Sequence, residues 1–257
     1  PKLIDMYKFD FVINLAAQAG VRYSIENPET YVDSNLVGFA NIIECCRNYN
    51  IRHLVYASSS SVYGENAKVP FNTEDRADYP VSLYAATKRC NELMAYTYSH
   101  LYGIRTTGLR FFTVYGPWGR PDMAPMLFAN AISNNERIRI FNNGNMSRDF
   151  TYIDDIIKGI EIVIGYHAAN SNHHPGFRIF NIGNGHPEKL LDFVETLESS
   201  LGIVGDKELI AMQPGDVTKT WADIIEMEKL GYRSTTSIND GIGKFVNWYS
   251  NYYNKEK

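Results

Sequence analysis

Three short apolar segments, separated by two segments with helical periodicity, most constrain how this chain can fold. The apolar segments 9–17, 53–64 and 104–117 are typical of buried strands. Residues 34–50 and 81–102 lie between them and carry apolar side chains at helical spacing. The alternation of strand and helix predicts an α/β fold, with a parallel sheet and right-handed crossovers.

The ends of the predicted strands carry the candidate functional groups. Ligands of such sheets bind beyond the carboxyl ends of the strands, which here fall at three places. The strand exits carry Ala16 and Ala17, the serine run 58–61, and Phe112 with Thr113. We expect these exits to face one crevice. A flexible loop is the alternative for the serine run, because serine favours turns.

The pattern becomes less regular after residue 117. Helical segments are expected near residues 124–134, from residue 153 and at the C-terminal end, with short strands between them. A further helix is expected to begin at Pro187, because proline is favoured in the first helical turn. We interpret this half as a smaller α/β lobe that closes over the crevice.

Charge and cysteine content exclude several classes of protein. The net charge is −4 and the pI is about 5.9, which argues against nucleic acid or a membrane surface as a partner. No apolar run approaches the roughly 18 residues of a membrane helix. Cys45, Cys46 and Cys90 have the spacing of neither a disulfide framework nor a metal site. We therefore expect no metal and a cytoplasmic location.

Tyr84 and Lys88 lie four residues apart in the second predicted helix, in the stretch "VSLYAATKRCNELM". Residues at this spacing share one helix face, where an ammonium group can lower the pKa of a tyrosine and make it a base. A packed tyrosine beside a solvated lysine is the alternative. The spacing alone does not decide between them, because such pairs arise by chance in many helices.

Several motifs, in their order along the chain, carry a family resemblance. They are "SSSSVYG", "YAATK", "LRFFTVYGP", "RDFTYIDD" and "PGD". Together they resemble the extended short-chain dehydrogenase/reductase family. Within it, "NLAAQAGVRYSIENPETYVDSNLVG" and "FTVYGPWGRPDMAPMLF" are most similar to nucleotide-sugar epimerases of the UDP-glucuronate 4-epimerase type.

The resemblance implies a Rossmann-type parallel sheet with helices on both faces, NAD as cofactor, and a UDP-sugar as substrate. The implied reaction is epimerisation at C4 through a 4-keto intermediate, with UDP-glucuronate converted to UDP-galacturonate. A 4-epimerase of UDP-glucose or of a UDP-N-acetylhexosamine or its uronate is an alternative. A non-catalytic nucleotide-binding member of the fold is another, although it would be expected to lack Tyr84, Lys88 or Ser59.

The chain departs from the family at its beginning. The Gly-x-x-Gly-x-x-Gly turn that holds the dinucleotide pyrophosphate does not occur in it. We expect the first βαβ unit to be missing, and the fragment as given to bind dinucleotide weakly and to be inactive. The expected NAD-binding part comprises residues 1–115 with about 151–183, and the nucleotide-sugar-binding lobe about 116–150 with 184–257.

The resemblance assigns catalytic roles to three residues. Tyr84 is the base at the sugar 4-hydroxyl, Lys88 lowers its pKa and holds the nicotinamide ribose, and Ser59 binds the same sugar oxygen. The residues implied to contact the cofactor are Ala16, Ala17, Ser34, Tyr84, Lys88 and Phe112.

Arg120 is the main indication of the sugar, because an arginine binds a carboxylate through two parallel hydrogen bonds and glucuronate has a carboxylate. A surface loop charge is its alternative role. Ser60, Ser61 and Thr113 are expected to add hydroxyl donors. Related dehydratases carry an acid and a base at the positions of Ser60 and Ser61, and the two hydroxyls here favour simple epimerisation.

The resemblance also implies a nucleotide site and an assembly. Arg148 is expected to meet the diphosphate, and Phe141 to stack on uracil or to be a core aromatic residue. Gln213 and Asp216 belong to a second nucleotide-contacting loop, in which Asp216 binds a ribose hydroxyl or caps a turn. A homodimer is expected through a four-helix bundle, formed by the helices that follow Ser34 and Ser82.

Overall fold

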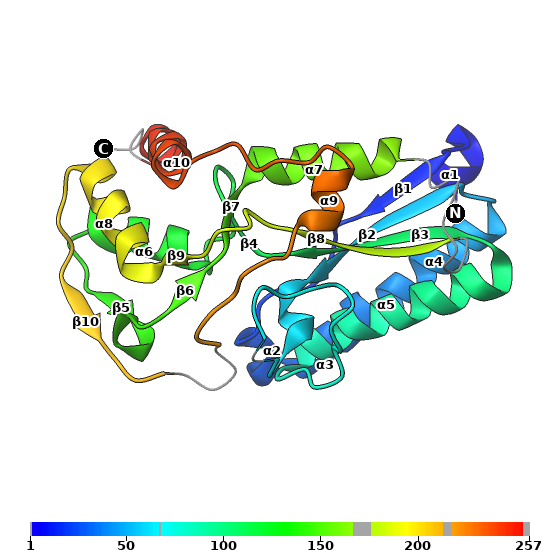
Figure 1. Cartoon of the computed structure of the whole chain (residues 1–257), viewed down its shortest axis with the longest axis horizontal. Helices are drawn as coiled ribbons and strands as arrows, with labels where there is room; N and C mark the ends of the chain where they lie inside the picture. The colour runs from blue at the N-terminus through cyan, green and yellow to red at the C-terminus, as the bar shows by residue number, and fades with distance from the viewer. Residues whose placement is uncertain (1, 67, 167–175, 213–216, 254–257) are drawn as a thin grey trace.

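A four-stranded parallel sheet forms the centre of one half of the molecule. The computed structural model describes residues 2–66, 68–166, 176–212 and 217–253. The strand order is β1-β2-β3-β8, and every neighbouring pair is parallel (Figure 1). The strands are β1 (Phe11–Asn14), β2 (His53–Ser59), β3 (Arg105–Phe111) and β8 (Phe177–Ile182). The predicted parallel sheet is confirmed.

Helices cover both faces of this sheet. Figure 1 shows α4 (Gly38–Asn48) and α5 (Leu83–Tyr102) on one face and α7 (Ile153–Gly165) on the other. The shorter helical elements of this half are α1 (Lys2–Tyr7), α2 (Tyr23–Glu26), α3 (Pro28–Tyr31), the π-helical stretch η1 (Val32–Val37), the 3₁₀ turn η2 (Ser60–Tyr63) and α9 (Ile225–Lys229).

Strand β2 shows why the sheet is buried on both faces. Successive side chains of a strand point to opposite sides. Leu54 and Tyr56 pack in one cluster with Ala95 of α5, whereas Val55 between them packs in another cluster with Ile160 of α7. All three strand residues are fully buried. The uninterrupted apolar run of β2 is therefore explained by cores on both sides.

Helix α5 ends at Tyr102, as expected, and begins at Leu83, two residues inside the expected segment. The side chain of Ser82 accepts a hydrogen bond of 3.1 Å from the backbone N–H of Ala85, which satisfies a donor of the first turn. Gly103 ends the helix in the left-handed conformation, with φ of 68°. These two caps fix which residues of the chain form the helix, and thereby place Tyr84 in its first turn.

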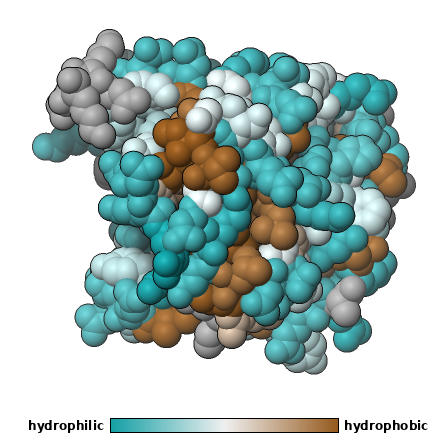
Figure 2. Space-filling model, turned by 90° about the vertical axis from the view of Figure 1, so that its left-hand side faces the viewer, coloured by the Kyte–Doolittle hydropathy of each residue, from teal (hydrophilic) through white to brown (hydrophobic). Residues whose placement is uncertain are grey.

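A second lobe has its own apolar core, which includes Tyr115, Ile140, Phe150, Phe193 and Phe245. Its elements are α6 (Ala124–Ser133), β5 (Ile138–Ile140), η3 (Phe141–Gly144), β6 (Ser147–Arg148), β9 (Glu188–Lys189), α8 (Leu190–Leu201), β10 (Lys207–Leu209) and α10 (Ile238–Tyr253). Figure 2 shows the end of the molecule formed by this lobe, where apolar side chains gather in a band across a hydrophilic surface.

No helix in the described parts of the chain has the length and apolar character needed to cross a bilayer.

Two expected elements differ in the structure. Segment 104–117 is not one strand, because β4 (Thr113–Tyr115) leaves the main sheet after Phe112 and pairs with β7 (Phe150–Tyr152). The helix expected to begin at Pro187 begins at Leu190 instead. Residues Glu188–Lys189 pair with β6 as a short antiparallel strand, and strand pairing replaces a first helical turn there.

Candidate active site

A cavity of about 960 Å³ contains the residues expected to bind substrate. Its wall combines residues that follow the carboxyl ends of β1 and β2 with residues of the second lobe. Every predicted substrate-binding residue that the structure describes lines this cavity: Ser60, Ser61, Thr113, Arg120, Phe141 and Arg148. Gln213 and Asp216 lie outside the described residues.

The serine run is ordered rather than a flexible loop. Ser58 and Ser59 end strand β2 and are buried, and Ser60 and Ser61 begin the 3₁₀ turn η2. The Ser59 hydroxyl oxygen caps this turn and accepts a hydrogen bond of 3.2 Å from the backbone N–H of Ser61. The strand end and its cap therefore give the serine hydroxyls defined positions, with Ser60 and Ser61 in the cavity wall and Ser58 and Ser59 outside it.

Tyr84 and Ser59 lie together although they are 25 positions apart in the sequence. Burial raises the pKa of Tyr84, while the hydrogen bond with Ser59 and the positive charge of Arg120 oppose that rise. The sequence argument expected Lys88 to lower the pKa of Tyr84. In the structure the two groups that oppose the effect of burial are instead Ser59 and Arg120, which approach Tyr84 from other elements.

Lys88 is buried, and its Nζ donates a hydrogen bond of 2.9 Å to the carbonyl oxygen of Ala57 in β2. Burial lowers the pKa of Lys88 to about 8, because removal from water disfavours the ammonium form. An ammonium group has three N–H donors, and Ala57 takes one in the described structure. The remaining donors suit the hydroxyl groups of a ribose.

The region that follows β1 carries two further residues expected to contact the cofactor, and this role stays a prediction. Ala16 and Ala17 have side chains of one carbon, which permit close approach of a ligand to the backbone. The buried side chain of Asn35 orders the next residues, because its oxygen accepts from the Gln18 N–H at 2.8 Å and its amide donates to the Gln18 carbonyl at 2.9 Å.

The other two expected cofactor contacts differ in their surroundings. Ser34 lies exposed on the π-helical stretch η1. Phe112 lies between β3 and β4 and is buried against the rings of Tyr63 and Phe71. Their contact with a cofactor stays a prediction.

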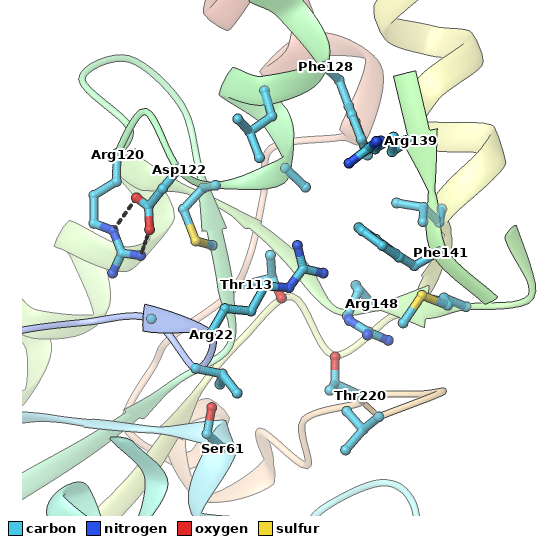
Figure 3. A pocket seen from close by; sticks show the side chains of 18 of the residues that line it. Arg22, Ser61, Thr113, Arg120, Asp122, Phe128, Arg139, Phe141, Arg148 and Thr220 are labelled. Atoms are coloured by element: carbon cyan, nitrogen blue, oxygen red, sulfur yellow. Dashed lines mark hydrogen bonds and ion pairs between the residues drawn. The ribbon is translucent and has the colours of Figure 1, made fainter. Parts of the chain in front are cut away.

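Arg120 already holds a carboxylate in the structure. Its Nε and Nη2 donate to the two carboxylate oxygens of Asp122 at 3.0 and 2.7 Å, and the pair lies at one side of the cavity (Figure 3). Gly20 permits this arrangement, because its φ is +108° and a Cβ there would lie 3.2 Å from Arg120 Nη2. Arg120 thus forms part of the cavity wall, with the Nε and Nη2 edge of its guanidinium group bound to Asp122.

Sequence reasoning missed Arg22. This residue lines the cavity, and its guanidinium carbon lies 4.4 Å from the centre of the Phe141 ring. Figure 3 shows the side chains of Arg22, Arg139 and Arg148 extending toward the same space. Arg22 follows the end of β1 by eight residues, so the strand-exit rule extended along the loop would have found it.

The charges of the cavity favour an anionic ligand. Arginine residues outnumber acidic residues in its lining, and low-dielectric walls strengthen such a field. Phe141 lines the cavity and also packs against the core of the second lobe, so both roles expected for it are compatible with its position. The cavity as a whole suits a ligand with a diphosphate and a flat base.

Comparison with known proteins gives consistent matches. The model of a family described as the NAD dependent epimerase/dehydratase family matches residues 1–183. A probable UDP-glucuronate 4-epimerase of Rhizobium meliloti is 47% identical, over 96% of this chain and 76% of that protein. Protein CapI of Staphylococcus aureus is 53% identical, over 96% of this chain and 77% of that protein.

A solved structure extends the likeness to three dimensions. It is the UDP-glucuronic acid 4-epimerase of Bacillus cereus, in complex with UDP-glucuronic acid and NAD. It is 32% identical, has a TM-score of 0.89, and the match covers 98% of this chain and 78% of that one.

Proposed function

We propose, from the premise that the chain belongs to the NAD-dependent epimerase/dehydratase family, that it interconverts UDP-glucuronate and UDP-galacturonate with NAD as cofactor. The observation that carries the proposal is the Tyr84–Ser59 contact, beside an arginine-rich cavity that also holds Arg120. The Rhizobium meliloti and Bacillus cereus relatives support the same reaction.

The proposed chemistry divides between the cofactor and the protein. NAD supplies a reversible acceptor for the hydride at C4 of the sugar, and the protein supplies position and proton transfer. Tyr84 removes the proton of the 4-hydroxyl group and returns it later, while Ser59 binds the same oxygen. Lys88 holds the nicotinamide ribose through the donors that Ala57 leaves available.

The uronate carboxylate is proposed to bind Arg120. Guanidinium has five N–H donors, of which the described contacts to Asp122 use two. The carboxylate therefore binds the remaining edge of the guanidinium group or takes the place of Asp122. Ser60, Ser61 and Thr113 line the same cavity and supply further hydroxyl donors. Ser60 and Ser61 stand where related dehydratases carry an acid and a base. Because serine hydroxyls do not replace such a pair, the proposed reaction is epimerisation rather than loss of water.

The nucleotide is proposed to bind the second lobe, with Arg148 at the diphosphate and Phe141 against uracil. Gln213 and Asp216 complete this part of the proposal. The sheet half then holds NAD through Ala16, Ala17, Ser34 and Phe112, together with Tyr84 and Lys88. We also propose a cytoplasmic location, which suits the three free cysteines.

The test uses the protein expressed from its complete gene. It is incubated with NAD and, separately, with UDP-glucuronate, UDP-glucose and UDP-N-acetylglucosamine, and the H4 signal of each sugar is followed by NMR. We expect conversion of the uronate only. Turnover of a neutral UDP-sugar instead would contradict UDP-glucuronate as the substrate. No turnover of any of the three would favour a non-catalytic nucleotide-binding protein.

Two variants test the carboxylate contact. Arg120→Ala is expected to lower kcat/KM for UDP-glucuronate by about 10- to 100-fold, the effect of losing a charged hydrogen-bonded partner. Asp122→Ala is the matched control, since it frees the guanidinium and leaves the substrate contact in place. Full preference for the uronate in Arg120→Ala would refute this role.

A further inference from the structure

A buried ion pair joins α5 to β3 one helical turn after Lys88. Glu92 of α5 and Arg110 of β3 are almost inaccessible to solvent. Arg110 Nε donates to Glu92 Oε1 and Arg110 Nη2 to Glu92 Oε2, each at 2.8 Å. Buried pairs of this kind are often no more stabilising than apolar residues of similar volume, because both charges lose their hydration. Stability alone therefore does not account for it.

The same carboxylate also binds strand β2. Ser58 donates a hydrogen bond of 2.7 Å to Glu92 Oε1. Ser58 and Arg110 are register partners on β2 and β3, so one helix side chain is tied to two neighbouring strands. Arg89 adds a contact of 2.8 Å to Glu92 Oε2 from the more exposed side of the helix.

Glu92 completes a series of contacts between α5 and the end of β2. Tyr84, Lys88 and Glu92 are spaced by four residues and share one helix face. Each meets a residue of β2 or its end: Tyr84 meets Ser59, Lys88 meets Ala57, and Glu92 meets Ser58. A slip of the helix by one residue, about 1.5 Å, would misalign every one of these contacts.

We propose that Glu92 is a positioning residue for the reaction: its ion pair with Arg110 and its hydrogen bond with Ser58 fix α5 on β2, so that the Tyr84 hydroxyl lies at Ser59. Apolar contacts are non-directional and permit sliding, whereas a two-point contact to guanidinium fixes distance and direction. The inference rests on the proposed function, because the rate of that reaction is what the position of Tyr84 controls.

The main test replaces both charges at once, in the protein expressed from its complete gene. The variant Glu92→Met/Arg110→Met keeps the volume apolar and leaves no unpaired buried charge. We expect a thermal midpoint close to that of the parent protein, a fall in kcat of at least tenfold, and a KM for the UDP-sugar within twofold. An unchanged kcat in the folded variant would overturn the proposal.

The pH profile separates positioning from a general loss of folded protein. Among the described residues, Ser59 and Arg120 act on the pKa of Tyr84, and the ring of Tyr31 packs against it with its centroid 6.2 Å from that of Tyr84. Loss of the Ser59 contact removes an interaction that opposes the rise of the Tyr84 pKa. The acid limb of the kcat profile is therefore expected to move to higher pH, and an unmoved limb would count against the proposal.

Two further variants complete the design. Ser58→Ala keeps the ion pair and removes only its link to β2, and we expect a three- to tenfold fall in kcat at constant KM. If the double variant does not fold, Ser58→Ala serves as the test instead. A kcat of Ser58→Ala equal to that of the parent protein would then overturn the proposal. Glu198→Met/Lys207→Met removes a partly buried pair of the second lobe and is expected to keep the parental kcat and pH profile.

The activity of the parent protein shows which of the two proposals fails. If the parent converts no UDP-sugar, the proposed function fails. If the parent is active and the variants match it, only the role of Glu92 fails.

Discussion

At the scale of single residues, the site depends on groups whose properties burial has changed. Lys88 has lost water around its ammonium group and is held by a backbone carbonyl. Burial raises the pKa of Tyr84, and this rise is opposed by Ser59 and by Arg120, which comes from a different loop. Arg120 differs from these two residues, because its side chain is 38% exposed and its guanidinium group is oriented by two hydrogen bonds to Asp122. Each effect can be tested by one substitution.

Tyr84→Phe removes the proposed base and leaves the ring in place. We expect kcat to fall by about 10²- to 10⁴-fold, the usual contribution of a general base. Far-ultraviolet circular dichroism should show unchanged folding. Tyr98→Phe is a matched control, because Tyr98 lies on the same helix but its hydroxyl donates to Glu44 instead. Parental activity in Tyr84→Phe would exclude it as the base.

Lys88→Met tests the cost of burying an ammonium group. The folded pKa of about 8 lies below the unfolded value of 10.5, so the unfolded state binds more protons between these values. Burial of the charge thus opposes folding below pH 8, and this cost disappears as the pH rises toward 10.5. We expect the variant to be more stable than the parent by about 2–3 kcal/mol at pH 7 and by much less at pH 10.

Chemical unfolding of the two proteins at both pH values measures this difference. Other titrating groups are common to both and cancel in the comparison. A stability gain that is equal at pH 7 and pH 10 would contradict the assignment. We also expect the variant to bind NAD more weakly, because the donors to the ribose are gone.

At the scale of elements, helix α5 carries most of the proposed machinery. Its first three turns present Tyr84, Lys88 and Glu92 to the end of β2, and its caps decide where those turns begin. The neighbouring element η2 holds the serine hydroxyls through the cap at Ser59. The catalytic geometry is therefore set by one helix, one strand end and one 3₁₀ turn.

Ser82→Ala tests the start of α5. Loss of the bond to the Ala85 N–H is expected to lower the free energy of unfolding by about 1 kcal/mol, the usual worth of an N-cap. Ser82→Asp should recover most of this loss, because an aspartate oxygen accepts the same bond and carries a favourable charge at a helix N-terminus. Urea unfolding provides the measurement. Equal losses in both variants would show that the cap contributes little.

At the scale of the whole molecule, we propose a homodimer in which α4 and α5 form a four-helix bundle with a second copy. Leu93 and Leu101 lie eight residues apart on α5 and are 53% and 61% exposed, which leaves an apolar stripe on the outer side of the helix. Burial of such a stripe against its own copy would give a two-fold interface.

Leu93→Glu/Leu101→Glu is expected to convert this dimer to a monomer, because burial of two carboxylates in an apolar interface is unfavourable. Light scattering with size-exclusion chromatography measures the mass. The control is Val204→Glu, since Val204 is 83% exposed in the second lobe, away from these helices. A parent protein that is monomeric would refute the proposed assembly.

Local sequence patterns determined the strands, the helices and the places where ligand groups leave the sheet. The continuous apolar run of β2 indicated burial on both faces, and the periodic segment 81–102 located α5. These features depend on periodicity and on caps within a few residues, so a single segment is enough to reveal them. The strand-exit rule likewise located Ser60, Ser61 and Thr113 at the cavity.

Only the tertiary structure decided which side chains meet across these elements. Arg22 lies over Phe141, Ser59 approaches Tyr84, and Glu92 joins Ser58 to Arg110. Such contacts join residues from 18 to more than 100 positions apart, and their energies depend on burial and on directed hydrogen bonds. These side chains become buried, and their hydrogen bonds become directed, only when the helices have packed on the sheet. Periodicity therefore identified the elements that form the site but not the contacts between them.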